Sequence, residues 1–402
     1  MKFVVAPDAF KGSLSAAEAA AIMRDAILAT LPTAKVQCVP MADGGEGTLD
    51  ALVASTQGHL VRVAVRNAQN QPCETCYGVL GGGETAVIEV AQVVGLTTVP
   101  ERDRNPFTLT TYGVGQLIAH ALEAGYRKLV IGLGGSATND GGFGLLQALG
   151  VEFFNVAGVK IPPFPAGLKE IHRVSFDHLL PAVSKAEIWL ASDVDNPLCG
   201  KDGCSAVFGP QKGATPKDIA VLDEALAHYA DVIEAERSGQ WRHCPGAGAA
   251  GGMGFALQVL GAKMGSGAKL VAEYCRLDQA LADADWVFTG EGRTDPQTAR
   301  GKVPHYVGTV AGRLGIPCVL ISGSFTDGVD ALYDTFVSVH AAVNCPMSVA
   351  DAVENAEALL FSATRNVARL ICRASSIELD NQNVQHEMVG HVQRIRTPEV
   401  EE

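Results

Sequence analysis

The sequence predicts an α/β protein of two domains: a doubly wound domain built from both chain ends, and a mixed α/β domain inserted between them. A chain of 402 residues, 47% of them apolar, is longer than one ordinary hydrophobic core accommodates. Strand and helix patterns alternate near both ends of the chain. The middle of the chain instead holds β-rich runs separated by glycine-rich turns, as antiparallel hairpins do.

The N-terminal segment has strand–helix–strand–helix order. Residues 3–6 (FVVA) are a predicted buried strand, and a capping box at 15–18 starts a helix that continues over 19–31. Residues 35–39 are a second predicted strand, followed by a helix around 46–55. This alternation of strands and helices is typical of a parallel sheet.

The middle segment changes character near residue 59. Residues 60–66, 74–80 and 85–90 form β-rich runs, the first two with alternating side chains, and predict an antiparallel sheet. A helix, a strand, a glycine-rich loop and a second helix follow between about 113 and 149.

The C-terminal segment returns to alternating strands and helices. Predicted strands cover 286–289, 317–321 and 336–343, and predicted helices cover 303–314 and 349–372.

These patterns divide the chain into three parts. Residues 1–59 together with 270–375 form the doubly wound domain, and 60–269 form the inserted domain. Residues 376–402 are a polar C-terminal tail, expected to be frayed or partly helical.

Composition excludes several classes of protein. A net charge of −13 argues against binding of nucleic acid through its phosphates. The sequence contains no run of about 18 apolar residues, so we expect no membrane span. The N-terminus does not resemble an export signal, and the ten dispersed cysteines are therefore expected to be reduced thiols of a cytoplasmic protein.

Charged residues follow the first two predicted strands. Ligands of an open α/β sheet bind at the carboxyl ends of its strands. Asp8 and Lys11 follow the first strand, where they could orient a substrate or contact a phosphate, or simply form a salt bridge in the turn. Asp43 and Glu46 lie in a glycine-rich turn and suit Mg²⁺ or a substrate hydroxyl. The alternative, which this motif alone favours slightly, is that the glycines serve turn geometry and Glu46 the helix N-terminus.

Two glycine-rich segments could hold an anion. Residues 132–142 join a strand to a helix, and such a loop presents backbone N–H groups to an anion. Residues 246–254 have G-x-G-x-x-G spacing, but 231–245 before them is not a strand, so a dinucleotide site is not predicted. Close packing between domains is the alternative there. The candidate ATP- or phosphate-binding residues are Gly134, Gly135, Ser136, Thr138, Asn139, Asp140, Gly248 and Gly251.

Further candidates follow a predicted strand at 187–191. Asp193 or Asp195 could take the proton of a substrate hydroxyl or hold Mg²⁺, although an Asx-turn is an alternative explanation. Lys212 could contact a phosphate or be a solvated loop lysine.

The segment after residue 289 carries several charges. Glu291, Arg293 and Asp295 are predicted to lie on a glycine-flexed loop at a strand end, and Lys302 follows. Arg293 could pair with a carboxylate through two parallel hydrogen bonds, and Lys302 could serve a phosphate.

General signatures of other enzymes are missing. The sequence contains no Walker A loop and no H-R-D or D-F-G set. Cys73 and Cys76 form one C-x-x-C without a second pair, and the histidines show no zinc spacing.

Taken together and in order, the motifs resemble the type I bacterial glycerate kinase family over nearly the whole chain. Each motif alone is weak, but several are long and unusual. The matching stretches are APDAFKGSLSA, DGGEGT, GLGGSATNDGG, SDVDNPL, FGPQKGA, PGAGAAGGMG, TGEGRTD and GKVP.

The resemblance implies transfer of the γ-phosphate of ATP to D-glycerate with Mg²⁺, giving 2-phosphoglycerate and ADP in organic acid catabolism. It also implies that the doubly wound domain is flavodoxin-like. Local residues do not distinguish the 2- from the 3-phosphorylated product.

A set of roles follows as a hypothesis. Asp193 accepts or positions the hydroxyl proton, and Arg293 binds the glycerate carboxylate. Lys302 or Lys212 offsets charge during transfer, while one glycine-rich loop cradles the phosphates. The other assigned residues are Asp8, Lys11, Glu291 and Asp295 for substrate, and Asp43 and Glu46 for the metal.

Two other functions stay open at this point. One is a nicotinamide-dependent hydroxy-acid dehydrogenase that uses the 132–142 loop, and the other is a non-catalytic protein that binds a small acid. A homodimer is one open assembly, because the sequence fixes no oligomeric state.

Overall fold

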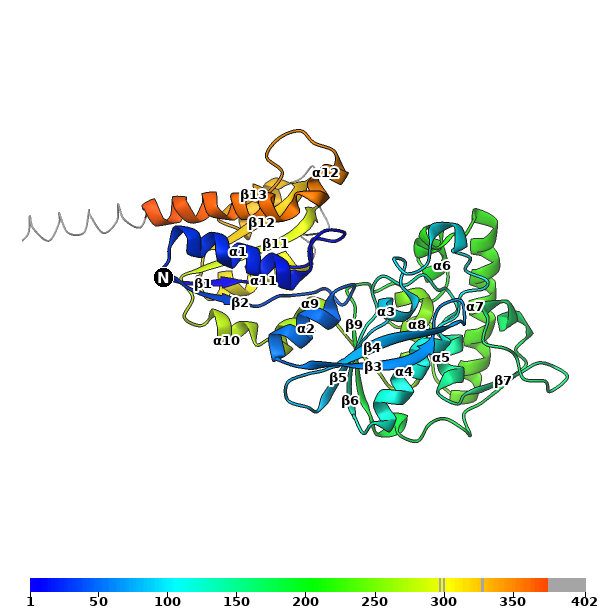
Figure 1. Ribbon diagram of the computed structural model, residues 1–402. Coiled ribbons are helices and arrows are strands. Elements are labelled where there is room, and N and C mark those ends of the chain that lie inside the picture. The colour runs from blue at the N-terminus through cyan, green and yellow to red at the C-terminus, as the bar shows by residue number, and fades with distance from the viewer. Residues whose placement is uncertain (296–297, 299–300, 327–328, 375–402) are drawn as a thin grey trace, which may run out of the picture.

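Two large sheets organise the computed structural model, which describes residues 1–295, 298, 301–326 and 329–374 (Figure 1). The predicted α/β class is confirmed. The predicted tail, 376–402, lies outside the described residues. Among the residues described, no helix has both the length and the apolar character needed to cross a bilayer.

The first sheet joins the two ends of the chain. Its strand order is β13–β12–β11–β1–β2, and every neighbouring pair is parallel. The register sets Phe3 of β1 opposite Trp286 of β11, so segments far apart in sequence lie side by side. The strands are β1 (Lys2–Val5), β2 (Lys35–Cys38), β11 (Trp286–Thr294), β12 (Cys318–Phe325) and β13 (Ser338–Ala341).

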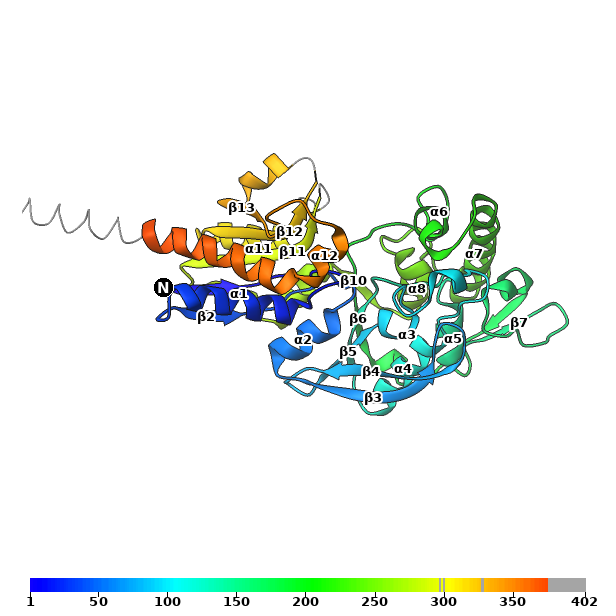
Figure 2. The same ribbon diagram turned by 45° about the horizontal axis from the view of Figure 1, so that its top comes forward.

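Helices cover both faces of this sheet, as the doubly wound pattern predicts. Phe3 and Val5 point to a core shared with α1 and a helix over 356–374, which lie beside each other in both views (Figure 2). Val4 lies between them in the strand, so its side chain points to the opposite face and to a second core that includes α10 and α11. The helices are α1 (Ala16–Thr30), α10 (Leu277–Leu281), α11 (Val303–Arg313) and the short α12 (Val349–Glu354).

The second sheet is mixed. Its order is β10–β9–β6–β5–β4–β3, in which β3–β4 and β4–β5 are antiparallel and the other pairs are parallel. The hairpin-like middle of the chain therefore forms one side of a sheet whose other side is parallel. The strands are β3 (His59–Arg66), β4 (Pro72–Val79), β5 (Thr85–Glu89), β6 (Lys128–Gly132), β9 (Glu187–Ala191) and β10 (Lys263–Gly265), with a separate antiparallel pair β7 (Glu152–Phe154) and β8 (Arg173–Ser175).

A large core and an aromatic cluster hold the helices of this second part. Tyr229 packs its ring against Phe143, Phe153 and Phe255, with centroids 5.6 to 6.0 Å away. The helices are α3 (Ala91–Val94), α4 (Tyr112–Glu123), α5 (Phe143–Ala148), α6 (Cys204–Phe208), α7 (Pro216–Arg237) and α8 (Ala249–Val259). Short 3-10 helices are η1 (Glu101–Asp103), η2 (Pro165–Glu170), η3 (Val183–Lys185), η4 (Pro210–Lys212) and η6 (Val329–Asp334).

Two helices connect the sheets. Leu49 and Leu52 of α2 (Thr48–Thr56) and Val271 of α9 (Gly267–Tyr274) belong to one buried cluster with Val4 of the first sheet and Val87 of the second. The core therefore runs without interruption from one sheet to the other. The domain boundaries at residues 59 and 270 stay predictions.

Two predicted elements differ from the structure. The helix predicted over 349–372 is broken at Asn355, where the backbone leaves helical geometry before the helix over 356–374 begins. The loop predicted after residue 289 is wrong: β11 continues to Thr294 and stays paired with β12. Glycines allow this close pairing, since a Cβ on Gly290 would lie 2.1 Å from the Ile321 carbonyl oxygen.

Candidate active site

The carboxyl edges of the two sheets meet at the turn Asp43–Gly44–Gly45. Gly134, just after β6, donates its N–H to the Gly44 carbonyl at 3.0 Å. A Cβ on Gly44 would lie 2.4 Å from the Ala191 carbonyl oxygen at the end of β9, and one on Gly134 would lie 2.4 Å from the Gly45 Cα. The glycines of this turn are therefore needed for close backbone approach.

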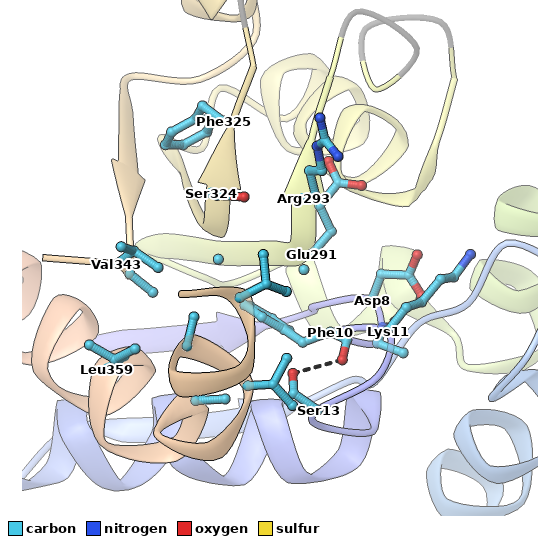
Figure 3. Close-up of a pocket in the computed structure, with 18 of the residues that line it drawn as sticks. Asp8, Phe10, Lys11, Ser13, Glu291, Arg293, Ser324, Phe325, Val343 and Leu359 are labelled. Carbon is cyan, nitrogen blue, oxygen red and sulfur yellow. Dashed lines mark hydrogen bonds between the residues drawn. The ribbon is translucent and has the colours of Figure 1, made fainter. Parts of the chain in front are cut away.

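A cavity of about 580 Å³ opens at the carboxyl edge of the first sheet. Figure 3 shows that charged side chains lie at one end, where Asp8, Lys11, Glu291 and Arg293 come from β11 and the loop after β1. This is the edge at which open α/β sheets bind ligands. The lining residues are Asp8, Ala9, Phe10, Lys11, Ser13, Asp43, Glu291, Gly292, Arg293, Lys302, Gly323, Ser324, Phe325, Ala342, Val343, Met347, Ser348, Val349, Ala352, Val353, Ala356 and Leu359.

Lys11 and Asp43 form an ion pair at the charged end. Lys11 Nζ lies 3.0 Å from Asp43 Oδ2, and Asp43 Oδ1 accepts the Gly45 N–H at 2.8 Å. Burial raises the pKa of Asp43, but the charge and hydrogen bond of Lys11 and the backbone N–H donors together outweigh it, so the net shift is downward. Likewise, burial lowers the pKa of Lys11, whereas the Asp43 and Asp8 carboxylates reverse that effect and raise it overall. Both groups are thus held in their charged forms.

Asp8 is the most deeply buried of these carboxyl groups. Its backbone N–H donates to the Gly290 carbonyl at 2.8 Å, which fixes Asp8 beside β11, and its side chain is 4% exposed. Burial, reinforced by the Asp43 carboxylate, raises the pKa of Asp8 to about 8. Asp8 therefore holds a proton near neutral pH, next to an ionised neighbour.

Glu291 and Arg293 project from β11. Glu291 is 6% exposed, and its Oε1 accepts hydrogen bonds from Thr294 and Thr298, each at 2.7 Å. Burial raises the pKa of Glu291 despite these hydroxyl donors. Arg293 is exposed in the cavity, and no carboxylate of the described residues forms an ion pair with it. Its guanidinium is therefore available to an anionic ligand.

Lys302 precedes α11 and also lines the cavity. Its Nζ lies 3.3 Å from Asp295 Oδ1, and both side chains are about one-third exposed. Asp295 itself does not line the cavity. Lys302 therefore faces both the cavity and an acidic partner.

Asp193 lies on the exposed loop after β9, near the same turn. Its Oδ1 accepts the N–H of Gly267 at 2.9 Å. Partial desolvation raises the pKa of Asp193, and the Asp43 carboxylate adds to that shift. Asp193 is close enough to Asp43 and Lys11 for their charges to act on its pKa, but it does not line the cavity.

Lys212 is buried beneath the 132–142 loop and is not the solvated lysine of the alternative interpretation. It is 2% exposed, and its Nζ donates to Ser136 Oγ at 3.1 Å and to the Thr138 carbonyl at 2.7 Å. Burial lowers the pKa of Lys212 to about 8. The side chain holds the glycine-rich loop from behind and does not line the cavity.

The rest of that loop is also fixed from within. Asp140 is fully buried and accepts hydrogen bonds from the backbone and hydroxyl of Thr111, at 2.9 and 2.8 Å, and from Gly142. Asn139 donates to Ser205 Oγ at 2.9 Å. Gly135, with φ of +75°, is the exposed part of the loop. The Gly134–Gly135 backbone is thus the most accessible part of this loop, although neither glycine lines the cavity.

The two glycine-rich segments pack against each other. Gly141 donates its N–H to the Gly251 carbonyl at 2.9 Å, and a Cβ on Gly251 would lie 2.0 Å from the Thr138 carbonyl oxygen. A Cβ on Gly248 would lie 2.3 Å from the Pro197 carbonyl oxygen. The glycines at 246–254 therefore serve close backbone packing between the two segments.

Glu89 was missed by the sequence analysis. It ends β5, is fully buried, and accepts the N–H groups of Gly47 and Leu49 at 3.2 and 3.0 Å. It thus caps the N-terminus of α2, which has no cap of its own. A signal existed, because a glutamate ends the apolar run TAVIEV and parallel pairing with β6 brings that end to the same edge.

The acidic side chains fit a metal that arrives with a nucleotide. Among the described residues, no group of three or more His, Cys, Asp or Glu side chains is arranged to hold a metal ion. Mg²⁺ in phosphoryl-transfer sites is usually held by one or two carboxylates together with substrate phosphates. Asp43 lines the cavity and meets that requirement, whereas Glu46 is exposed and does not line it.

Fold and site together define an α/β protein with a charged cavity suited to a small-molecule substrate. The model of the glycerate kinase family matches residues 3–372, and the chain belongs to that family. The glycerate kinase of Halalkalibacterium halodurans is 41% identical over 91% of this chain and 97% of that protein. Glycerate 2-kinase of Escherichia coli K12 is 40% identical over 92% and 97% of the two chains.

A solved structure agrees with this assignment. The crystal structure assigned to glycerate kinase 2 of Salmonella typhimurium LT2 has a TM-score of 0.84 and 41% identity, covering 94% of this chain and 99% of that one. The predicted family and kinase class are confirmed. The comparisons give no support to a dehydrogenase or to a non-catalytic acid-binding protein.

Proposed function

We propose that the protein transfers the γ-phosphoryl group of ATP to the 2-hydroxyl of D-glycerate, giving 2-phosphoglycerate and ADP. Family membership supports ATP as donor and glycerate as acceptor. One observation carries the site: Lys11, Arg293 and Lys302 converge on a single cavity at the carboxyl edge of the first sheet. Three cations in an acidic protein suit two anionic substrates.

The hydroxyl oxygen of glycerate attacks the γ-phosphorus as the bond to the ADP oxygen breaks. Asp193 takes the hydroxyl proton, and the raised pKa of its carboxyl group supports that role. Arg293 holds the glycerate carboxylate with Lys11, because a free guanidinium can bind a carboxylate through two parallel hydrogen bonds. Asp8, Glu291 and Asp295 are proposed to orient the substrate.

Lys302 is proposed to offset the charge of the transferring phosphoryl group. Its position in the cavity favours it over Lys212, whose amine is buried and already donates to Ser136 and Thr138. The exposed Gly134–Gly135 backbone is proposed to contact phosphate oxygens. Mg²⁺, held by Asp43 and the phosphates, would neutralise charge on the bridging oxygens.

Phosphorus NMR of the full chain with ATP, MgCl₂ and D-glycerate tests the proposal. We expect a new phosphomonoester resonance matching authentic 2-phosphoglycerate, which appears together with ADP and only when D-glycerate is present. L-Glycerate serves as the matched control substrate. A resonance of 3-phosphoglycerate would overturn the assigned position, and ADP release independent of glycerate would overturn the reaction.

We also propose a cytoplasmic homodimer. The buried cysteines Cys204 and Cys318 are thiols that form no disulfide, which suits a reducing compartment. Light scattering of the purified protein measures the oligomeric state, and a monomer mass at micromolar concentration would contradict the dimer.

A further inference from the structure

The cavity has two chemically different ends. Charged residues occupy one end, while Val343 and Leu359 lie at the other, with Phe10 between them (Figure 3). The far end is formed by the last residue of β12, the segment that follows β13, α12 and the start of the helix over 356–374. Its apolar lining is Phe325, Ala342, Val343, Met347, Val349, Ala352, Val353, Ala356 and Leu359.

The apolar end does not suit glycerate. Glycerate has three carbons, each bearing oxygen, so it presents no apolar face. A volume of about 580 Å³ lies within the range of pockets for much larger ligands. The only component of the proposed reaction with a large flat apolar surface is the purine ring of ATP.

The wall itself lacks a partner within the described residues. Val349 is 82% exposed and Val353 is 41% exposed, and no residue of α12 is buried. Apolar side chains gathered on a concave surface beside a charged site are typical of a ligand groove. A ring seated there would cover them.

We infer that the apolar end of this cavity, between the carboxyl ends of β12 and β13 and the 343–359 segment, binds the adenine ring of ATP. This inference rests on the proposed ATP dependence. The triphosphate then extends along the carboxyl end of β11 toward Lys302. Glycerate then occupies the charged end beside Lys11 and Arg293, on the side near Asp43 and Asp193. ATP thus contacts the first sheet, and glycerate lies where the two sheets meet.

Ala352→Trp tests the inference by filling the apolar end. Isothermal titration with ADP, with inorganic pyrophosphate and with D-glycerate separates the three parts of the site. We expect affinity for ADP to fall by about tenfold or more, because the ring loses its apolar seat. Affinities for pyrophosphate and D-glycerate should stay within about twofold. Ala350→Trp is the matched control, since Ala350 is exposed on the same helix and does not line the cavity.

A second variant keeps the test informative if Ala352→Trp does not fold. Val353→Asn changes a half-exposed side chain and should weaken ADP binding with pyrophosphate binding unchanged. Unchanged ADP affinity in both variants would overturn the adenine site, as would an equal loss for pyrophosphate. Failure of the proposed reaction gives a different result: the unmodified protein would then bind ADP but form no phosphoglycerate.

Discussion

Lys11 Nζ lies 3.0 Å from Asp43 Oδ2, and this ion pair joins the loops that follow the neighbouring strands β1 and β2. It keeps one cation and one anion ionised at the charged end of the cavity. Asp8, beside them, is consequently the carboxyl group that retains its proton.

Lys11→Met removes the cation of this pair. We expect kcat/KM for glycerate phosphorylation to fall by about 100-fold or more, the usual loss of one positioned charge at a transition state. Steady-state assays coupled to ADP release measure it. Lys128→Met is the matched control, because Lys128 forms an exposed ion pair with Glu84 far from the cavity. Equal losses in both variants would contradict a specific role of Lys11.

Asp193→Asn removes the proposed proton acceptor. We expect kcat to fall by about 10² to 10⁴-fold, the range typical of a lost general base, with little change in ADP binding. Asp195→Asn is the control, since Asp195 is an exposed acid on the same loop. Near-normal turnover in folded Asp193→Asn would transfer the role to another residue.

Asp8 should make the protein less stable as pH rises. Its pKa is raised to about 8 in the folded protein, from an ordinary value of 3.8. The unfolded chain therefore binds fewer protons than the folded protein between those two pH values, and the free energy of unfolding falls as pH rises through that window. Asp8→Asn should reduce the difference between pH 5 and pH 8 by more than about 1 kcal/mol in urea titrations.

The control for Asp8 is Asp50→Asn, at an exposed position on α2. It should leave the pH dependence of the unfolding free energy unchanged. A wild-type pH profile in Asp8→Asn would show that Asp8 is ionised in the folded protein.

Lys212 should have the opposite effect at higher pH. Its pKa is lowered to about 8 from 10.5, so between these values the unfolded chain binds more protons and stability rises with pH. Lys212→Met should lose that rise, measured by urea unfolding at pH 8 and pH 10. Lys217→Met, on the exposed side of α7, is the control. A rise that persists in Lys212→Met would assign it to another group.

Gly134→Ala tests the contact between the two carboxyl edges. The added methyl would lie 2.4 Å from the Gly45 Cα, where both partners are backbone. Overpacking of this kind costs about 1–3 kcal/mol of stability, and displacement of the Asp43 turn should also lower kcat/KM. Gly312→Ala is the control, because a Cβ at Gly312 meets nothing within 4 Å. Unchanged stability and activity in Gly134→Ala would show that close contact between the carboxyl edges of the two sheets is not required.

The sequence predicted most of the elements, because their signals are local. The capping box of Ser15 and Glu18 marks the start of α1, and the alternation in β3 and β4 matches their antiparallel pairing. The strand-end rule also placed Asp8, Lys11, Glu291 and Arg293 in one cavity. That rule works because parallel strands bring their carboxyl ends to a common edge.

Other features depend on contacts distant in sequence. Lys212 differs from a surface lysine only through burial under the 132–142 loop, and Gly251 packs against Thr138 far away in the chain. No local pattern encodes such proximity. The apolar end of the cavity was missed for the same reason, since Val349 and Ala352 resemble an ordinary helix until their position beside β12 is known.

The parallel pairing of β1 with β11 has a consequence for synthesis of the protein. The ribosome makes β1 first and must complete the whole second sheet before Trp286 emerges. At about 5–20 residues per second, the β11-facing edge of β1 waits unpaired for on the order of tens of seconds. Unpaired edges are the usual starting points of aggregation. A nascent chain that stalls before β11 should therefore expose an unpaired, aggregation-prone edge of β1 after all strands of the six-stranded sheet have been synthesised.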